Sequence, residues 1–284
     1  MNNSLIKIIK LAIGTIFIIL LISFTVLSDE LKRSRNITQT DALSGQRIGV
    51  MSGWETDYFL SERQDITLKR YDTTAELFMA LSYKQVDAVA VDAATLMQAQ
   101  ASISGLKTVG GPFATTQYTT YTKKDDIKTL KELNDFIEVF KKSEEYPKFV
   151  EHFYDLDWIK SEQLTEQKGT GEEIGIAYVA EYYPFEYVTE NGTPAGSEIE
   201  FAIQFANYYN YRIKWIKSTT NTAFLDVSSG KAKFIMCSGT DAYRQETLNE
   251  NSLVSMSDGY IDSNIYCVVT DGDVNVINTE FYGE

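Results

Sequence analysis

Two stretches of this chain repeat each other at a fixed distance, and this repeat restricts the fold more than any single motif does. The segment Thr73–Ser82 recurs 146 positions later as Thr219–Ser228, with paired threonines, a phenylalanine, an aliphatic residue and a serine at matching places. In both copies the apolar residues return every three or four positions, which predicts a short helix. Self-similarity at one offset indicates that a supersecondary unit is used twice.

Strand-like segments flank both copies of this helix and extend the repeat. The first copy reads as Arg47–Met51, helix Trp54–Arg63, Ile66–Tyr71, helix Thr73–Ser82 and Asp87–Val91; the second reads as Glu173–Val179, helix Ser197–Tyr209, Tyr211–Lys217, helix Thr219–Ser228 and Phe234–Cys237. A strand–helix alternation predicts an α/β fold, here two small lobes with mainly parallel sheets. The alternative is one larger doubly wound domain with a fortuitous repeat.

Length and charge set further bounds. A chain of 284 residues is long enough for two lobes with separate cores. It has 26 lysines and arginines against 40 aspartates and glutamates, a net charge of −14, and no basic stretch with interleaved aromatic residues. This balance disfavours a nucleic-acid-binding role.

Metal and triad chemistry are disfavoured by the single histidine. His152 lies on a polar and apolar helical run, Phe149–Tyr154, which indicates a surface or interlobe position. One histidine excludes a multi-histidine metal site and makes a Ser-His-Asp triad improbable. We therefore expect no metal and no cofactor. Cys237 and Cys267 are consistent either with a disulfide in an exported protein or with two buried thiols.

The N-terminus predicts export. Lys7 and Lys10 precede Leu11–Leu27, an uncharged apolar run of 17 residues that is just long enough for a bilayer core and long for a signal peptide. We assign residues 1–35 to a signal sequence or transmembrane anchor and favour the uncleaved anchor, although Val26 and Ser28 suit a cleavage site. No cysteine lies here, which excludes a lipoprotein anchor. In either case the body is expected outside the cytoplasm, membrane-anchored or secreted.

The second copy of the repeat resembles the first lobe of the family 3 extracellular solute-binding proteins, which have the type II periplasmic binding fold. The motifs that carry the resemblance are Pro184-Phe185-Glu186-Tyr187, Gly196-Ser197-Glu198-Ile199-Glu200, Gly230-Lys231-Ala232-Lys233, Thr240-Asp241-Ala242-Tyr243-Arg244 and Ser257-Asp258-Gly259-Tyr260. Lys233 stands where the family has aspartate, and Thr240 is one position further from Arg244 than the family's threonine.

The first copy resembles the second lobe of the same family. The matching motifs are Leu43-Ser44-Gly45-Gln46-Arg47-Ile48-Gly49-Val50, Tyr71 and Val86-Asp87-Ala88-Val89-Ala90-Val91-Asp92, and the family's closing helices correspond to Leu133–Phe149. The family's second half therefore precedes its first half. This order predicts a circularly permuted two-lobe clamp.

The resemblance also sets the expected domain boundaries. Residues 43–122 with 268–284 would form the lobe matching the family's second lobe, and residues 126–265 would form the other. A polar linker, 160–171, joins the old ends; it ends in Gly169-Thr170-Gly171. A phosphate-binding loop is the alternative reading, but no helix start follows, so we expect a flexible connection.

Two charged residues suit a zwitterionic ligand, since a buried charge needs a partner. Arg244 offers a fork for a carboxylate and Asp92 a counter-charge for an amine. Both follow predicted strands, at the edge where open α/β sheets bind ligands, and the resemblance implies the same two roles. The plainer readings are a solvated turn arginine and a helix N-cap.

Four further residues complete the predicted binding site. Gly53 and Trp54 begin a helix whose free N–H groups suit an anionic group, and Gly239 follows a strand where a missing side chain lets a ligand approach. The resemblance implies that Tyr182 flanks the ligand. The alternatives are a turn glycine for Gly239, a core residue for Trp54 and a surface aromatic for Tyr182.

The function we expect from the sequence is solute binding without catalysis. Two lobes would close on a small polar ligand, an amino acid in the first instance, and deliver it to an ABC permease. A second reading is the ligand-sensing ectodomain of a membrane signalling protein. A third is a dehydratase on the same fold, for which Glu55 is the candidate general acid.

Overall fold

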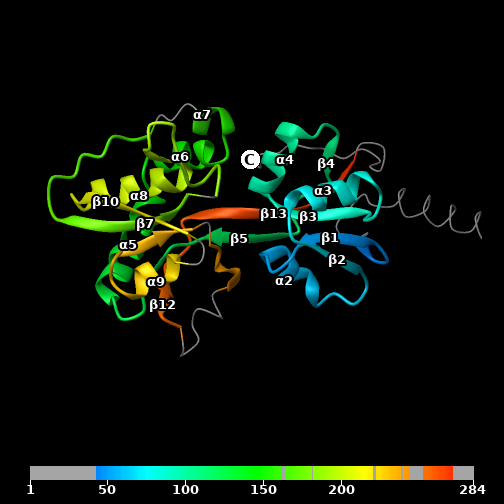
Figure 1. The fold of residues 1–284 in the computed structure, drawn as a ribbon, viewed down its shortest axis with the longest axis horizontal. Helices are drawn as coiled ribbons and strands as arrows, with labels where there is room; N and C mark the ends of the chain where they lie inside the picture. Colours follow the sequence, from blue (N-terminus) through cyan, green and yellow to red (C-terminus); the bar gives the residue numbers. More distant parts are fainter. Residues whose placement is uncertain are drawn as a thin grey trace, which may run out of the picture. The chain divides into compact units, whose positions relative to one another are not determined.

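The computed structural model describes residues 43–160, 164–180, 182–219, 222–237, 239–243 and 252–270, and these fall into two units. The first contains residues 43–91, 98–113 and 266–270 of the described chain, and the second contains residues 92–97 and the described part of 114–265. Each unit is built on its own sheet (Figure 1).

The first sheet has the strand order β2-β1-β3-β13-β4, and β5 (Ala114–Tyr118) pairs with β13 as its sixth strand. Its elements are β1 (Arg47–Met51), α2 (Glu55–Ser61), β2 (Thr67–Tyr71), α3 (Thr74–Ser82), β3 (Ala88–Asp92), α4 (Ala93–Ser102), β4 (Leu106–Thr108) and β13 (Ile261–Thr270). Strand β1 pairs in parallel with β2 and β3, whereas β13 pairs antiparallel with β4. Thr73 caps α3 by accepting a hydrogen bond from the Glu76 N–H.

Helices cover both faces of this sheet. On one face Ile48 and Val50 of β1 pack with Leu60 of α2 in a single core cluster. On the other face lies Gly49, where a Cβ atom would stand only 2.8 Å from the Leu77 side chain of α3. All five residues of β3 are buried, as expected for a strand covered on both sides.

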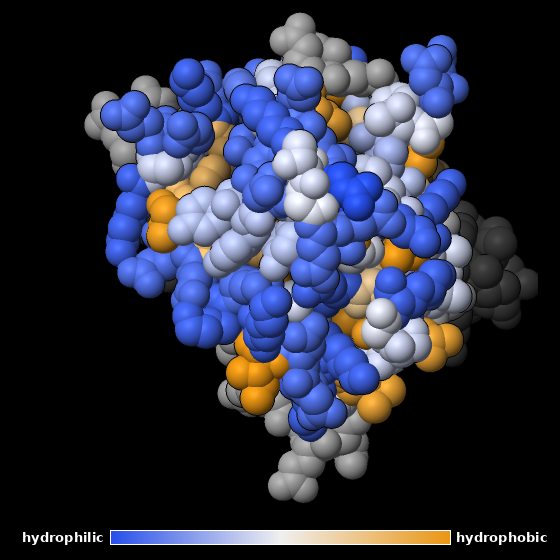
Figure 2. Space-filling model, turned by 90° about the vertical axis from the view of Figure 1, so that its left-hand side faces the viewer, coloured by the Kyte–Doolittle hydropathy of each residue, from blue (hydrophilic) through white to orange (hydrophobic). Residues whose placement is uncertain are grey.

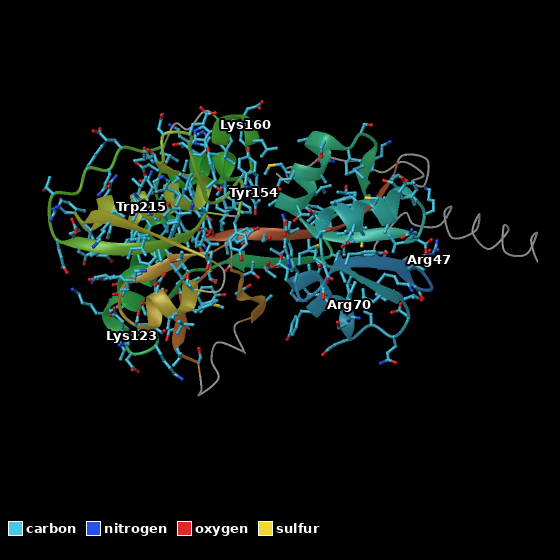
Figure 3. The ribbon with its side chains drawn as sticks, in the orientation of Figure 1. Arg47, Arg70, Lys123, Tyr154, Lys160 and Trp215 are labelled. Carbon is cyan, nitrogen blue, oxygen red and sulfur yellow. The ribbon has the colours of Figure 1, made fainter. Side chains whose placement is uncertain are left out.

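A salt bridge ties the beginnings of β1 and β3 together. Arg47, labelled in Figure 3, donates from Nη2 to Asp87 Oδ1 at 2.7 Å, and its backbone N–H donates to the same carboxylate.

The second sheet has the strand order β10-β7-β11-β6-β12. The elements of this unit are β5 (Ala114–Tyr118), β6 (Tyr121–Lys123), α5 (Ile127–Phe140), α6 (Tyr146–Phe153), α7 (Leu156–Lys160), β7 (Glu173–Val179), β8 (Tyr187–Val188), β9 (Pro194–Ala195), α8 (Ser197–Tyr208), β10 (Arg212–Ser218), α9 (Ala223–Ser228), β11 (Phe234–Met236), the 3-10 turn Asp241–Tyr243 and β12 (Val254–Met256). Strands β10, β7 and β11 are parallel, and β6 is antiparallel to β11 and β12.

Alternation along β7 divides the core of this unit. Ile174 and Ile176 face an aromatic cluster that includes Phe201 of α8, whereas Ala177 and Val179 face a cluster with Val227 of α9. The outer side of this unit seen in Figure 2 is largely hydrophilic, with hydrophobic side chains scattered over it. Such scattered residues are normal for a protein surface.

Both predicted strand–helix units are present, and the predicted α/β class is confirmed. The alternative of one larger doubly wound sheet is wrong, because the parallel strands of the two copies lie in two separate sheets. We also expected Val268–Asn275 to return to the neighbourhood of β1. For Val268, Val269 and Thr270 this is confirmed, since β13 lies between β3 and β4; residues 271–275 lie outside the described part.

The boundary between the units differs from the expected one. We placed it after residue 122, but the chain from Ala114 onward belongs to the second unit. The reason is a long-range pairing: β5 runs antiparallel to the first half of β13, with Tyr118 opposite Ile261. The second half of β13 belongs to the first unit.

The described part of the linker, residues 164–171, is held by hydrogen bonds, which differs from the flexible connection that we expected. Side chains of α8 bind its backbone: Glu200 accepts from the Thr165 N–H at 2.7 Å, and Asn207 accepts from the Lys168 N–H at 2.7 Å. At its end Asn210 accepts from the Thr170 N–H at 2.9 Å. With its backbone hydrogen bonds supplied by this helix and the turn after it, residues 164–171 are held in place.

The N-terminal segment, the single histidine and the two cysteines also carried predictions. The N-terminal segment 1–35 and its apolar run lie outside the described residues. Among the helices that the structure describes, none has the length and apolarity needed to cross a membrane. His152 lies on α6 with its ring stacked on Trp158, the centroids 4.4 Å apart. Cys237 and Cys267 are both free thiols.

Candidate functional site

The carboxyl-terminal edge of the second sheet is the candidate site. Strands β7, β10 and β11 end there at Val179, Ser218 and Met236, and the antiparallel β6 begins there at Tyr121. Open α/β sheets bind ligands at this edge, because the loops after the strands gather there.

The loop after β7 carries Tyr182 and is closed by a set of backbone hydrogen bonds. The Tyr182 N–H donates to Val179 O at 3.3 Å, and the N–H groups of Phe185 and Glu186 both donate to Tyr182 O, at 2.8 and 3.0 Å. The Tyr183–Pro184 peptide bond within it is cis. The Tyr182 side chain is partly buried against the cluster that contains Val179. The loop therefore has a defined shape, with Tyr182 at its start.

A buried carboxyl pair lies directly behind this loop. Glu186 and Glu198 are both 0 % exposed. The Val179 N–H donates to Glu186 Oε2 at 2.6 Å, and the Tyr260 hydroxyl donates to Glu198 Oε1. Burial raises the pKa of Glu186 well above its ordinary value, and the neighbouring Glu198 raises it further by charge repulsion and hydrogen bonding. This carboxyl group therefore holds its proton to a higher pH than an exposed glutamate does.

The groups around the pair are acids as well. Burial raises the pKa of Tyr260 and Cys237 well above their ordinary values, and the two glutamates add to both shifts. Burial also raises the pKa of Tyr178, again with a contribution from Glu186. Behind the β7 loop the two buried glutamates are thus surrounded by a neutral thiol and two neutral tyrosine hydroxyl groups.

The turn after β11 is fixed by packing. At Gly239 a Cβ atom would lie 2.4 Å from the ring of Tyr121, so this ring fills the space that we assigned to a ligand. The Gly239 carbonyl accepts a hydrogen bond from the Thr119 N–H at 2.8 Å. Thr240 forms a bridge with Tyr118, and Asp241 accepts from the Gln117 N–H at 2.9 Å. The missing side chain of Gly239 is explained by Tyr121, as in the turn-glycine reading.

Arg244, the predicted carboxylate ligand, lies outside the described residues. The described chain stops at Tyr243, two residues after Asp241, and resumes at Ser252.

Asp92 is placed at the end of β3, as predicted, and it caps α4. Its Oδ1 accepts from the Thr95 N–H at 2.6 Å, and the residue is 8 % exposed. Burial raises the pKa of Asp92 in spite of the hydrogen bonds from Thr95 and Ala94. The N-cap reading is therefore correct, and the carboxylate retains acceptor capacity beyond the cap.

The first turn of α2 binds a carboxylate from its own chain. The Gly53 N–H donates to Asp57 Oδ2 at 3.1 Å, and the Trp54 N–H donates to Met51 O at 3.2 Å. Arg70, labelled in Figure 3, donates from Nε to the same Asp57 carboxylate at 2.9 Å. These two N–H groups, which we assigned to an anionic ligand, thus have partners within the chain. Trp54 is 41 % exposed, so it is no core residue.

The sequence reasoning missed the carboxyl pair, although it had singled out both motifs that contain it. Glu186 follows Pro184-Phe185, and Glu198 opens the helix after Gly196. No local signal marks their burial, because it depends on the packing of α8 on the β7 loop, where the Glu198 N–H donates to Phe185 O.

Comparison with known proteins identifies the segment that carries this edge. Residues 174–277 match the model of the family described as "Bacterial extracellular solute-binding proteins, family 3". This segment belongs to the family 3 extracellular solute-binding proteins. The matched segment covers a little over a third of the 284 residues. It includes β7, α8, β10, α9 and β11.

Solved structures resemble the chain weakly. The VFT2 domain of BvgS from Bordetella pertussis matches with a TM-score of 0.40 and 14 % identity, covering 80 % of this chain and 81 % of that one. The ancestral amino acid-binding protein AncCDT-1, a precursor of cyclohexadienyl dehydratase, matches with a TM-score of 0.38 and 13 % identity over 81 % and 83 %. The ligand-binding component of an ABC-type import system from Staphylococcus aureus matches with a TM-score of 0.38 and 9 % identity over 80 % and 66 %.

All three TM-scores are below 0.5, so no conclusion about this chain follows from them. No protein with curated annotation matches the chain.

Proposed function

We propose that this protein binds an amino acid or a similar small polar solute on the outer side of the cytoplasmic membrane. The observation that carries the proposal is the family 3 match of residues 174–277, because it covers the strands whose carboxyl ends form the candidate edge. The role is binding without catalysis.

In this proposal Arg244 binds the ligand carboxylate and Asp92 binds its ammonium group. Support for Asp92 comes from its burial, which leaves a carboxylate with acceptor capacity that an ammonium group suits. Tyr182 contributes an aromatic face at the start of the β7 loop. Because Gly53, Trp54 and Gly239 have partners within the chain, we assign no ligand contact to their backbone N–H groups or to the space beside Gly239.

We further propose that the chain is a circular permutant of the family fold. Two features support this. The family 3 match lies in the second half of the chain, and each sheet contains a strand from the other half: β13 lies in the first and β6 in the second. The first unit would then correspond to the family's second lobe.

A thermal-shift experiment on the full chain tests the ligand class. At a hundredfold excess over Kd, a ligand that binds only the folded state adds about 2.7 kcal/mol of stability, a rise of roughly 2–4 °C in Tm per kcal/mol. We expect at least one of the twenty amino acids to give such a rise. Arg244→Gln should abolish it.

The matched control is Arg212→Gln. Arg212 is an exposed arginine of the same unit at the beginning of β10, the opposite edge of the sheet, where it pairs with Glu173. Its replacement should leave the ligand-induced rise intact. Absence of a rise with every amino acid, or equal losses in the two variants, would contradict the proposal.

Uptake through an ABC permease and sensing by a membrane signalling partner are two uses of the same binding. Cross-linking in the native membrane with the ligand present separates them, because uptake requires contact with a permease subunit. Capture of a signalling protein instead would establish the second use.

A further inference from the structure

The loop that carries Tyr182 depends on one side chain for its closure. Glu186 accepts the Val179 N–H at 2.6 Å through Oε2, while its own N–H donates to Tyr182 O at 3.0 Å. These two hydrogen bonds join the end of β7 to the far end of the loop. On the other side the Glu198 N–H donates to Phe185 O at 3.0 Å, so α8 holds the loop too.

The Glu186 and Glu198 carboxyl groups are in contact inside the protein, and neither is exposed. Two ionised carboxylates have only acceptor oxygens, so a hydrogen bond between them exists only when one carries a proton. Glu186 Oε1 is buried and has no other donor in the described structure. A proton on the pair supplies the missing hydrogen bond and removes one of two buried charges.

In the described structure, burial and the neighbouring acid Glu198 raise the pKa of Glu186. The titratable groups that face the pair are Tyr178 of β7, Cys237 after β11 and Tyr260 before β13, with Tyr118 of β5 beside Tyr260. Within the described residues, no lysine or arginine is among the groups that shift the pKa of Glu186. The raised pKa values of Tyr178, Cys237 and Tyr260 keep these three groups neutral near neutral pH, and the Tyr260 hydroxyl donates a hydrogen bond to Glu198 Oε1.

We infer that Glu186 is a positioning residue for Tyr182: a proton shared by the Glu186 and Glu198 carboxyl groups holds the β7 loop in shape, and its loss releases the loop. This inference rests on the proposed function only for the ligand-binding role of Tyr182. The shared proton and the loop it holds stand on the contacts alone.

The dependence of stability on pH follows with a definite sign. The pKa of Glu186 is raised in the folded state, so the folded state binds more protons than the unfolded one above the ordinary glutamate value of 4.5. The stabilisation is complete below that pH and is lost as the pH rises through the raised pKa. In the pH range where the folded state holds one more proton than the unfolded state, the folding equilibrium constant falls about tenfold for each unit of rising pH.

The first experiment measures urea unfolding of the full chain without ligand across this range. The folding equilibrium constant of wild type should fall as the pH rises. For Glu186→Gln this fall should be smaller by a factor of about ten per pH unit. The amide still accepts the Val179 N–H and donates to Glu198, but it has no proton to lose. Glu190→Gln is the control, because Glu190 is an exposed glutamate in the turn that follows. It should follow the wild-type curve.

If Glu186→Gln does not fold, infrared spectroscopy of wild type decides the matter. A protonated carboxyl group has a carbonyl band distinct from that of a carboxylate. One such band, from a buried group whose proton exchanges slowly with solvent, should remain at neutral pH. Parallel slopes for wild type and Glu186→Gln, or absence of that band, would overturn the inference.

A second experiment measures binding of whichever amino acid raises Tm. Affinity in wild type should fall with pH in parallel with the loss of the proton, Glu186→Gln should bind with wild-type affinity and without that fall, and Glu186→Ala should bind weakly at every pH. If no amino acid binds, the proposed function fails while the stability slopes still test the proton. If a ligand binds with the same pH profile to wild type and Glu186→Gln, the positioning role is wrong.

Discussion

In the first unit the strands run in the order β2-β1-β3-β13-β4, and in the second they run β10-β7-β11-β6-β12. In each order the first strand of the repeat lies between the second and the third. The third strand is followed by a strand from the other half of the chain, β13 in the first sheet and β6 in the second. Even the glycines correspond: Gly49 in β1 and Gly175 in β7 both follow an isoleucine, and a Cβ atom at either would collide with its neighbours.

The two cores differ in what fills them. The core cluster around β1 contains aliphatic side chains such as Ile48, Val50 and Leu60, whereas the cluster around β7 and α8 contains aromatic rings such as Phe201 and Tyr260. The second unit also has α5 and α6 over this cluster. One strand order thus accommodates two different kinds of packing, because sheet topology depends on the backbone and the core depends on side-chain volume.

The largest expected effect tests whether these cores are separate. Phe201 is fully buried and stacks on Tyr260 with centroids 4.2 Å apart, so Phe201→Ala should cost about 3–5 kcal/mol. Leu60→Ala in the first unit should cost about 2–5 kcal/mol. Hydrogen exchange read by mass spectrometry should show lost protection mainly in the mutated unit. Equal losses throughout the chain for both variants would mean that the two cores unfold together.

A smaller effect concerns the dependence of stability on pH. Asp57 in the first unit should stabilise the fold less as the pH falls, whereas Glu186 in the second unit should stabilise it less as the pH rises. Burial acts to raise the pKa of Asp57, but hydrogen bonds from Arg70, Gly53 and Ser61 outweigh it and hold the pKa below the ordinary 3.8. The stabilisation by this carboxylate is present above pH 3.8 and is lost as the pH falls through the lowered value. Asp57→Ala should cost about 1.5–3 kcal/mol near neutral pH and little in acid.

Urea unfolding at both pH values measures this difference. Asp72→Ala, at an exposed aspartate just after β2, is the control and should change stability little at either pH. A cost for Asp57→Ala that does not shrink in acid would show that the charge is irrelevant there.

The smallest effects concern two glycines that the fold needs for different reasons, one for space and one for its backbone conformation. Gly239→Ala should cost about 1–3 kcal/mol through collision with Tyr121, and the cost should shrink in a Tyr121→Leu background. Gly53 has φ +72° and open space around it, so Gly53→Ala should cost about 1–2 kcal/mol from the left-handed backbone alone. That second cost should be unaffected by Tyr121→Leu. Thermal unfolding of the two pairs of variants provides the test.

Local patterns made the strands and helices predictable. Glu173–Val179 was predicted with the bounds that β7 has, because its apolar residues and flanking turns belong to the segment itself. The N-cap reading of Asp92 needed only Thr95, three residues on. The pairing of β5 with β13 joins residues about 147 positions apart, as Thr116 and Ser263 are, and leaves no local signal.

The same limit applied to the candidate site. Glu186 and Glu198 are glutamates with polar neighbours such as Ser197, and composition alone predicts that such residues are exposed. Only the packing of α8 on the β7 loop buries them together. The role of Asn207 and Asn210 in holding the linker was hidden for the same reason, since it depends on side chains reaching a segment about 40 residues earlier in the chain.

The position of β13 also bears on when the chain folds. The first sheet begins with β1 at residue 47, yet the strand between β3 and β4 is made of residues that the ribosome adds more than 150 positions after β4. Contacts of such long sequence separation close slowly. Until β13 has been synthesised, the nascent first sheet lacks the strand that joins β3 to β4.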